Sequence, residues 1–151
     1  MSEKARNMVL LVVGLSDNKL YGLTKLQKIS FLINQKVYNW VKFKPSPTGP
    51  FSDEIMKAVD VLEREGKLKV ELDSTDSYEL TKTGEDEYIK LVKALKSEDW
   101  EKFKKAREIV EMFSKVPPGY LVAFIYKYYP GYFEKGSFND TFEKWVSYFN
   151  L

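Results

Sequence analysis

The chain has 151 residues, of which 44% are hydrophobic and 15% aromatic, so it is long enough and apolar enough to bury a core. It contains neither cysteine nor histidine, which excludes disulfides, thiolate zinc sites, thiol nucleophiles and mechanisms that need an imidazole base. The longest strongly apolar runs are too short to span a bilayer and the start shows no signal-peptide pattern, so a cytoplasmic location without membrane association is expected.

The net charge is only +2, but the charges are distributed unevenly along the chain. Residues 18–44 hold six lysines and no acid, whereas residues 51–89 hold twelve acids and five bases, a net charge of −7. A basic segment followed by an acidic one is the main electrostatic feature of the sequence. The abundance of Lys and Glu without Cys is also typical of proteins from thermophiles.

Two helices are expected at the start of the chain. Residues 4–15 carry apolar side chains at helical spacing, which predicts a buried helix. A second helix is expected to begin at Thr24, because Thr24 and Gln27 have the spacing of a capping box. The prolines and glycine of "FKPSPTGPF", residues 43–51, then exclude regular structure.

A third helix and a hairpin follow. Ser52 is expected to cap a helix over residues 52–65, and Gly66 is expected to end it. Residues 68–72 alternate between apolar and charged side chains, which predicts a strand with one covered face. Residues 73–77 form turns readily, and residues 78–80 are expected to return as the partner strand.

Four further helices are expected after the hairpin. Thr83, with Asp86 three positions later, is expected to cap the fourth helix, and Ser97 is expected to cap the fifth. Residues 120–129 are apolar on all sides, which predicts a buried helix. The final helix is expected from about Ser137.

The expected fold is mainly α with a small two-stranded antiparallel hairpin, an α+β class in which three helices precede the hairpin and four follow it. The clearest boundary falls near residue 85, where no flexible linker marks it. Residues 1–85 are therefore expected to form one unit, and residues 86–151 a helical extension packed on it as one compact body.

The order of helices and hairpin resembles that of winged-helix proteins such as the MarR and PadR groups. Two phrases carry this resemblance: "LEREGKL", residues 62–68, closes the recognition helix and begins the wing in those groups, and "LTKTG", residues 80–84, leaves the wing for the next helix. The resemblance implies a winged helix-turn-helix with a C-terminal helical extension. It also implies that residues 52–65 are a recognition helix for double-stranded DNA.

Three other phrases resemble a group of uncharacterised prokaryotic winged-helix proteins that are distantly related to the Panacea antitoxin domain. They are "LTKLQK" at residues 23–28, "GPFS" at residues 49–52 and "IYKYYPGY" at residues 125–132. This second resemblance implies either DNA binding in transcription regulation or inhibition of a partner protein, as an antitoxin does.

The lysine-rich residues 19–44 are the candidate phosphate-binding segment. Phosphates are attracted to lysines near a helix N-terminus, and a loop with basic and aromatic residues can contact backbone or bases. The candidate nucleic-acid contacts are Lys25, Lys28, Lys42, Lys44, Lys57, Arg64 and Lys67. The alternative is a solvated lysine face in which Trp40 and Phe43 pack as core.

The acidic charge of the third helix and hairpin opposes DNA binding. Residues 52–65 carry five acids and two bases, and acids in the hairpin turn would repel phosphates. The alternative hypothesis is therefore a protein-interaction module, antitoxin-like or an adaptor. Its candidate partner contacts are Asp53, Asp60, Asp73 and Asp76. The lysine segment is also complementary to the acidic surface of a second copy, so a homodimer is a further expectation.

No catalytic residue, metal site or cofactor is expected. The sequence has no phosphate-binding glycine loop and no Gly-x-Ser-x-Gly elbow. The acids of "GEDE", residues 84–87, are ordinary for a first helical turn. The aromatic residues 124–133 are expected to fill a core or interface rather than to stack on bases. The protein is therefore expected to be non-enzymatic, with DNA or a protein as its partner.

Overall fold

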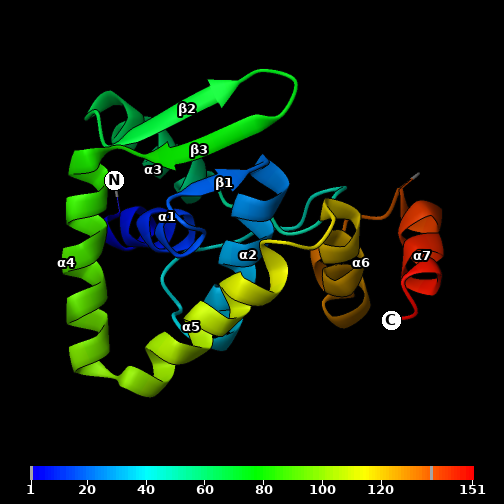
Figure 1. Ribbon diagram of the computed structural model, residues 1–151. Helices are drawn as coiled ribbons and strands as arrows, with labels where there is room; N and C mark the ends of the chain where they lie inside the picture. Colours follow the sequence, from blue (N-terminus) through cyan, green and yellow to red (C-terminus); the bar gives the residue numbers. More distant parts are fainter. Residues whose placement is uncertain (1, 137) are drawn as a thin grey trace.

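The computed structural model describes residues 2–136 and 138–151 (Figure 1). Its helices are α1 (Glu3–Leu15), α2 (Leu23–Lys36), α3 (Asp53–Arg64), α4 (Lys82–Glu98), α5 (Trp100–Phe113), α6 (Pro118–Tyr128) and α7 (Asn139–Tyr148), with a 3-10 turn at Pro130–Tyr132. The strands are β1 (Lys19–Tyr21), β2 (Leu68–Leu72) and β3 (Asp76–Leu80). These elements confirm the mainly helical α+β class.

The sheet has three antiparallel strands in the order β1-β3-β2, where the sequence predicts only the β2–β3 hairpin. In the hairpin, Leu68 lies opposite Leu80, and the ladder continues to the pair at the tip. On the other side of β3, Leu20 of β1 lies opposite Tyr78. A strand of three residues is too short to show the alternation by which strands are predicted.

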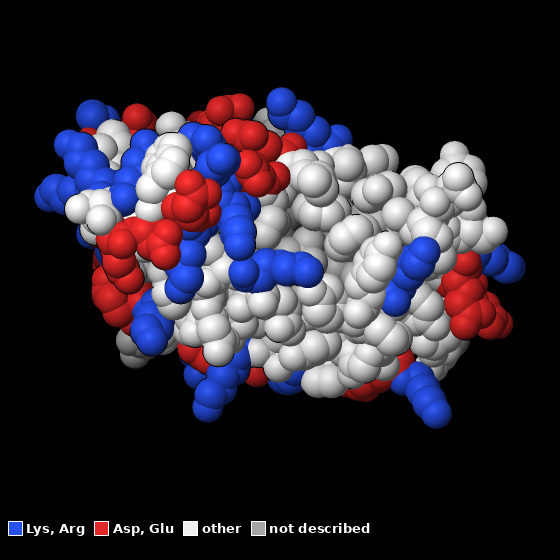
Figure 2. Space-filling model, turned by 90° about the horizontal axis from the view of Figure 1, so that it is seen from below, with Lys and Arg blue, Asp and Glu red and all other residues white. Residues whose placement is uncertain are grey.

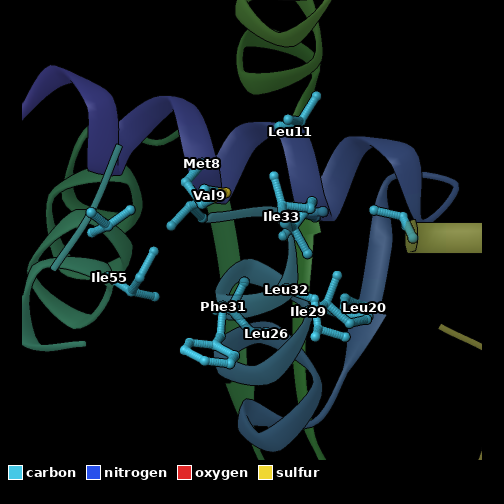
Figure 3. Close-up of a cluster of buried hydrophobic side chains, with 14 of the residues drawn as sticks. Met8, Val9, Leu11, Leu20, Leu26, Ile29, Phe31, Leu32, Ile33 and Ile55 are labelled. Atoms are coloured by element: carbon cyan, nitrogen blue, oxygen red, sulfur yellow. The ribbon is translucent and has the colours of Figure 1, made fainter. Parts of the chain in front are cut away.

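The centre of the core lies between α1 and α2 (Figure 3). Residues 8–13 of α1 are all fully buried, because α2, α3, α4 and the sheet surround this helix. Ile29 and Ile33 of α2, Leu20 of β1 and Ile55 of α3 point into the same cluster. A helix that is apolar on all sides requires such cover, as the sequence pattern of α1 predicts.

The C-terminal helices pack on this core and on each other. The helix α4 crosses α1 (Figure 1), and the ring of Tyr88 lies so close to Gly14 that a Cβ there would collide with it. The helices α5 and α6 cover α2, and α7 packs against α6 (Figure 1). Among the described residues, no helix combines the length and apolarity that crossing a membrane requires.

The helix ends test the capping predictions. Ser52 caps α3 as predicted, because its Oγ accepts a hydrogen bond from the backbone N–H of Ile55 at 3.2 Å. Gly66 follows the end of α3 with a φ of 72°, the left-handed conformation expected there. The prediction of a capping box at Thr24 is wrong, because α2 begins at Leu23 and its N-cap residue, Gly22, has no side chain to cap it.

Two later caps are shifted along the chain. The cap of α4 is Thr81 rather than Thr83, and its Oγ1 accepts from the N–H of Gly84 at 3.2 Å. The cap of α5 is Asp99 rather than Ser97, because α4 continues to Glu98 before the chain turns. The predicted start of the last helix at Ser137 lies outside the described residues, and α7 is described from Asn139.

A network of charged side chains surrounds the guanidinium of Arg6, which is only 7% exposed. Nε and Nη2 of Arg6 donate to the two carboxylate oxygens of Glu87 at 2.7 and 2.8 Å, and Nη2 also lies 2.8 Å from Oε1 of Glu65. Nζ of Lys67 donates to Glu87 at 2.5 Å. The hydrogen bonds from Arg6 first, and from Lys67, lower the pKa of Glu87 to about 2. The network joins α1 to α4 and to the link between α3 and β2.

Replacing Glu87 by Gln should lower the free energy of unfolding by about 3 kcal/mol at pH 7, because Arg6 then keeps only one acid partner. The pKa of Glu87 falls from 4.5 to about 2 on folding, so its stabilisation is complete above pH 4.5 and is lost as the pH falls toward 2. Urea unfolding of the wild type and Glu87→Gln should therefore give a smaller difference at pH 3 than at pH 7.

The neighbouring variant Asp86→Asn is the matched control. Asp86 forms an exposed i,i+4 pair with Lys82 at 2.9 Å, and such pairs contribute roughly 0.5 kcal/mol or less. Equal losses in the two variants, or a loss in Glu87→Gln that does not change with pH, would contradict a stabilising role for the buried network.

Candidate functional site

The lysines of residues 19–44 do not form one surface. Lys28 is only 4% exposed, and its Nζ donates to the backbone carbonyl of Pro50 at 3.2 Å. An ammonium in this position does not reach a DNA phosphate, so the prediction for Lys28 is wrong. Lys25 is half-buried, and its Nζ donates to the carbonyl of Ser114 at 2.5 Å, just after the end of α5. The ammonium groups of Lys25 and Lys28 are thus turned toward backbone carbonyls of the protein rather than toward a duplex in solution.

The helix α2 uses its polar side chains to hold the loop before α3. The amide of Gln27 donates to the carbonyl of Ser52 at 3.1 Å and accepts from its N–H at 2.9 Å, and all these atoms are buried. Together with the bond from Lys28 to Pro50, these contacts fix residues 50–52 on α2. This explains why Gln27 does not take part in the predicted capping box.

Lys42 and Lys44 are exposed and lie beside the N-terminal end of α3. Nζ of Lys44 is 2.9 Å from the carboxylate of Asp53, and the backbone N–H of Lys42 donates to Glu54 at 3.1 Å. The positive charge of this loop therefore faces the acids in the first turn of α3. Trp40 and Phe43 of the same loop pack against the core, as the alternative interpretation of residues 19–44 predicts.

The two aromatic rings of the loop pack inside the protein. Trp40 stacks on Tyr38 with 4.3 Å between ring centroids, and Phe43 meets Phe31 edge to face at 5.4 Å. Both rings are partly buried against the hydrophobic core. Neither is arranged as a free platform on which bases could stack.

The outward face of α3 carries the expected charges, but most are paired. Arg64 lies 2.6 Å from Asp60 at i,i+4. Lys67 is held in the network around Arg6 by Glu87 and Glu65. Lys57 is also a candidate nucleic-acid contact, and within residues 2–136 and 138–151 it is exposed and makes no ion pair.

The hairpin continues the acidic character of α3. Lys69 pairs with Glu71 at 3.1 Å, and Asp73 and Asp76 stand at the turn without an ion pair within the described part of the chain. The side chain of Leu72, at the end of β2, is 74% exposed. The hairpin tip is therefore apolar and acidic rather than basic.

The helix α3 and the hairpin lie at one end of the molecule, at the top of Figure 1. We call residues 53–80 the acidic end, because they contain nine acids and four bases. Of the four bases, Arg64, Lys67 and Lys69 form ion pairs. The four predicted partner contacts, Asp53, Asp60, Asp73 and Asp76, all belong to this end.

The side of the molecule opposite to the acidic end mixes basic and acidic side chains (Figure 2). Viewed from below, Lys and Arg side chains are interspersed with Asp and Glu toward the α4 side, and the surface toward α6 and α7 carries few charges (Figure 2). A duplex needs a continuous row of positive charges to bind through its phosphates. This face does not present such a row.

Comparison with known proteins does not assign the chain to a family. No family model matches the sequence, and no curated protein is significantly similar to it. In the part of the chain that the structure describes, no group of three or more acids is placed to hold a metal ion. The function must therefore be inferred from the geometry and charge of the surfaces themselves.

The buried ammonium of Lys28 gives a prediction for stability. Burial lowers its pKa from 10.5 to about 8 in the folded protein. The unfolded chain thus binds more protons between these pH values, so the wild type should gain stability as the pH rises from 8 to 10. In Lys28→Met this gain is absent, so the stability of the variant relative to the wild type should fall by roughly 2 kcal/mol over that range.

Urea unfolding at pH 7, 8, 9 and 10 measures this difference. The exposed Lys36, on the same helix, provides the control variant Lys36→Met, whose stability should follow the wild type across the series. Parallel curves for all three proteins would show that Lys28 is not a buried cation.

Proposed function

We propose that the protein is a non-enzymatic interaction module on a winged-helix scaffold, and that it binds a protein partner through the acidic end. The observation that carries this proposal is the negative charge of that end, which contains nine acids and four bases. A helix and hairpin of this charge are repelled by phosphates, whereas they complement a basic protein surface.

The order of elements supports the winged-helix scaffold. A helix, a short strand, two helices and a hairpin follow each other, and the first strand adds to the hairpin to give the order β1-β3-β2. The connection between α2 and α3 is unusual, because residues 37–52 replace the turn of three or four residues that joins the helices of a helix-turn-helix. In this scaffold α3 occupies the place of the recognition helix.

The hairpin tip suggests the chemistry of the partner. Leu72 is 74% exposed beside the exposed Asp73, so an apolar side chain projects from an acidic surface. Such a combination fits a partner that surrounds an apolar pocket with Lys or Arg, because the apolar contact supplies affinity and the charges supply specificity.

Double-stranded DNA is the second candidate partner. Lys42, Lys44 and Lys57 are exposed, and the first two lie beside the N-terminal end of α3. These lysines could approach phosphates beside that end. Phosphate binding would, however, compete with Asp53 for Lys44, and Asp53 and Glu54 already occupy the first turn of the helix.

Fluorescence anisotropy with two labelled probes tests the proposal. The wild type should bind a lysine-rich peptide at about 50 mM salt, although its own net charge is +2, and should not bind a random-sequence duplex. The triple variant Glu63→Gln/Asp73→Asn/Asp76→Asn should bind the peptide about tenfold more weakly, because it removes three negative charges from the acidic end.

A variant with the same change in net charge is the control. Glu98→Gln/Glu101→Gln/Glu108→Gln removes three exposed acids from α4 and α5, and it should bind the peptide like the wild type. Equal losses in the two triple variants would assign peptide binding to net charge alone and refute the acidic end as the site.

The duplex titration decides between the two candidates. Duplex binding that weakens steeply with salt and is lost in Lys42→Ala/Lys57→Ala would replace the proposed function by DNA binding.

A further inference from the structure

A cavity of about 410 Å³ lies between α2, α6, α7 and the loop before α3. Its walls are mostly apolar, with Val122 of α6 and Phe142 and Trp145 of α7 among them. Thr24 and Lys28 of α2 also line it, together with Thr48 of the loop. The volume lies within the range of small-molecule sites, about 300 to 1,000 Å³.

The one ionisable group among the described residues that line this cavity is Lys28. An ammonium has three donors, and Pro50 accepts from one of them. No acid among residues 2–136 and 138–151 forms an ion pair with it. A buried charge is costly unless it is paired, so this lysine lacks the counter-ion that its surroundings demand.

The apolar walls of the cavity limit which anions can pair with Lys28. A phosphate or sulfate would have to leave water for largely apolar walls, at a high desolvation cost. A carboxylate has the charge to pair with Lys28, and an apolar body attached to it would fill the remaining volume. The hydroxyls of Thr24 and Thr48 offer further donors to the carboxylate oxygens.

We propose that this cavity binds a small carboxylic acid with an apolar body, whose carboxylate pairs with Nζ of Lys28. The apolar body packs on Val122, Phe142 and Trp145. The ligand therefore joins α2 and the loop before α3 to α6 and α7. This site does not depend on the proposed protein partner.

Binding of hexanoate to the full-length protein tests the proposal. NMR spectra of ¹⁵N-labelled protein at pH 7 should show saturable shifts of the Trp145 indole N–H as hexanoate is added. Hexanamide has the same shape without the charge, and it should bind at least about tenfold more weakly, because it does not form the charge-assisted hydrogen bond. This comparison uses the wild type and needs no variant to fold.

Two lysine variants locate the carboxylate. Lys28→Met should bind hexanoate at least about tenfold more weakly than the wild type. Lys25→Met removes a half-buried lysine of the same helix that does not line this cavity, so it should bind hexanoate like the wild type. Equal binding of hexanoate and hexanamide, or unchanged binding in Lys28→Met, would overturn the proposal.

A carboxylate can also come from the end of a peptide. An apolar tripeptide with a free C-terminal carboxylate, titrated beside hexanoate, separates the two sources. Weaker binding of the tripeptide supports a small acid as the ligand, whereas tighter binding would overturn that assignment in favour of a chain terminus.

Discussion

The need to cover α1 on every side determines the rest of the fold. Residues 8–13 of this helix are fully buried, and no single neighbour can remove so much apolar surface from water. The helices α2 and α3 and the sheet cover part of it, and α4 covers the remainder by lying across Gly14. The network around Arg6 then fixes the charged N-terminal end of α1 between α4 and the start of the hairpin. The N-terminal part therefore requires α4 to complete the cover of α1.

Local patterns predicted the end points of α3 correctly, misplaced the caps of α4 and α5 by two residues, and failed where distant residues decide. The cap at Ser52 and the left-handed turn at Gly66 follow from neighbouring residues, and both were predicted correctly. The strand β1 exists only because β3 offers it a free edge, from almost sixty positions along the chain. The side chain of Gln27 likewise depends on a distant residue, because it forms hydrogen bonds with the backbone of Ser52 and not with the N-terminal end of its own helix.

The sequence predicts how many charges each segment carries, but it does not predict which of them lie on the surface. The sequence shows how many lysines residues 19–44 contain, but only the packing of α5 and the loop before α3 decides that Lys25 and Lys28 turn inward. The acids of α3 and the hairpin stay at least partly exposed, as solvated charges normally do. Folding therefore leaves fewer lysines available to phosphates, whereas the acids of α3 and the hairpin stay available to a basic protein surface. Lys28 moves from a surface role to the wall of a cavity, which no local pattern could indicate.

The late position of β3 in the chain has a consequence for how the protein folds. The two strands of the hairpin are separated by a few residues and can pair rapidly, whereas β1 reaches β3 only after the intervening chain has closed into a loop. That loop contains all of α2, α3 and the connection between them. Such a high sequence separation slows folding, so completion of the sheet is expected to belong to a late step, after the local helices and the hairpin have formed.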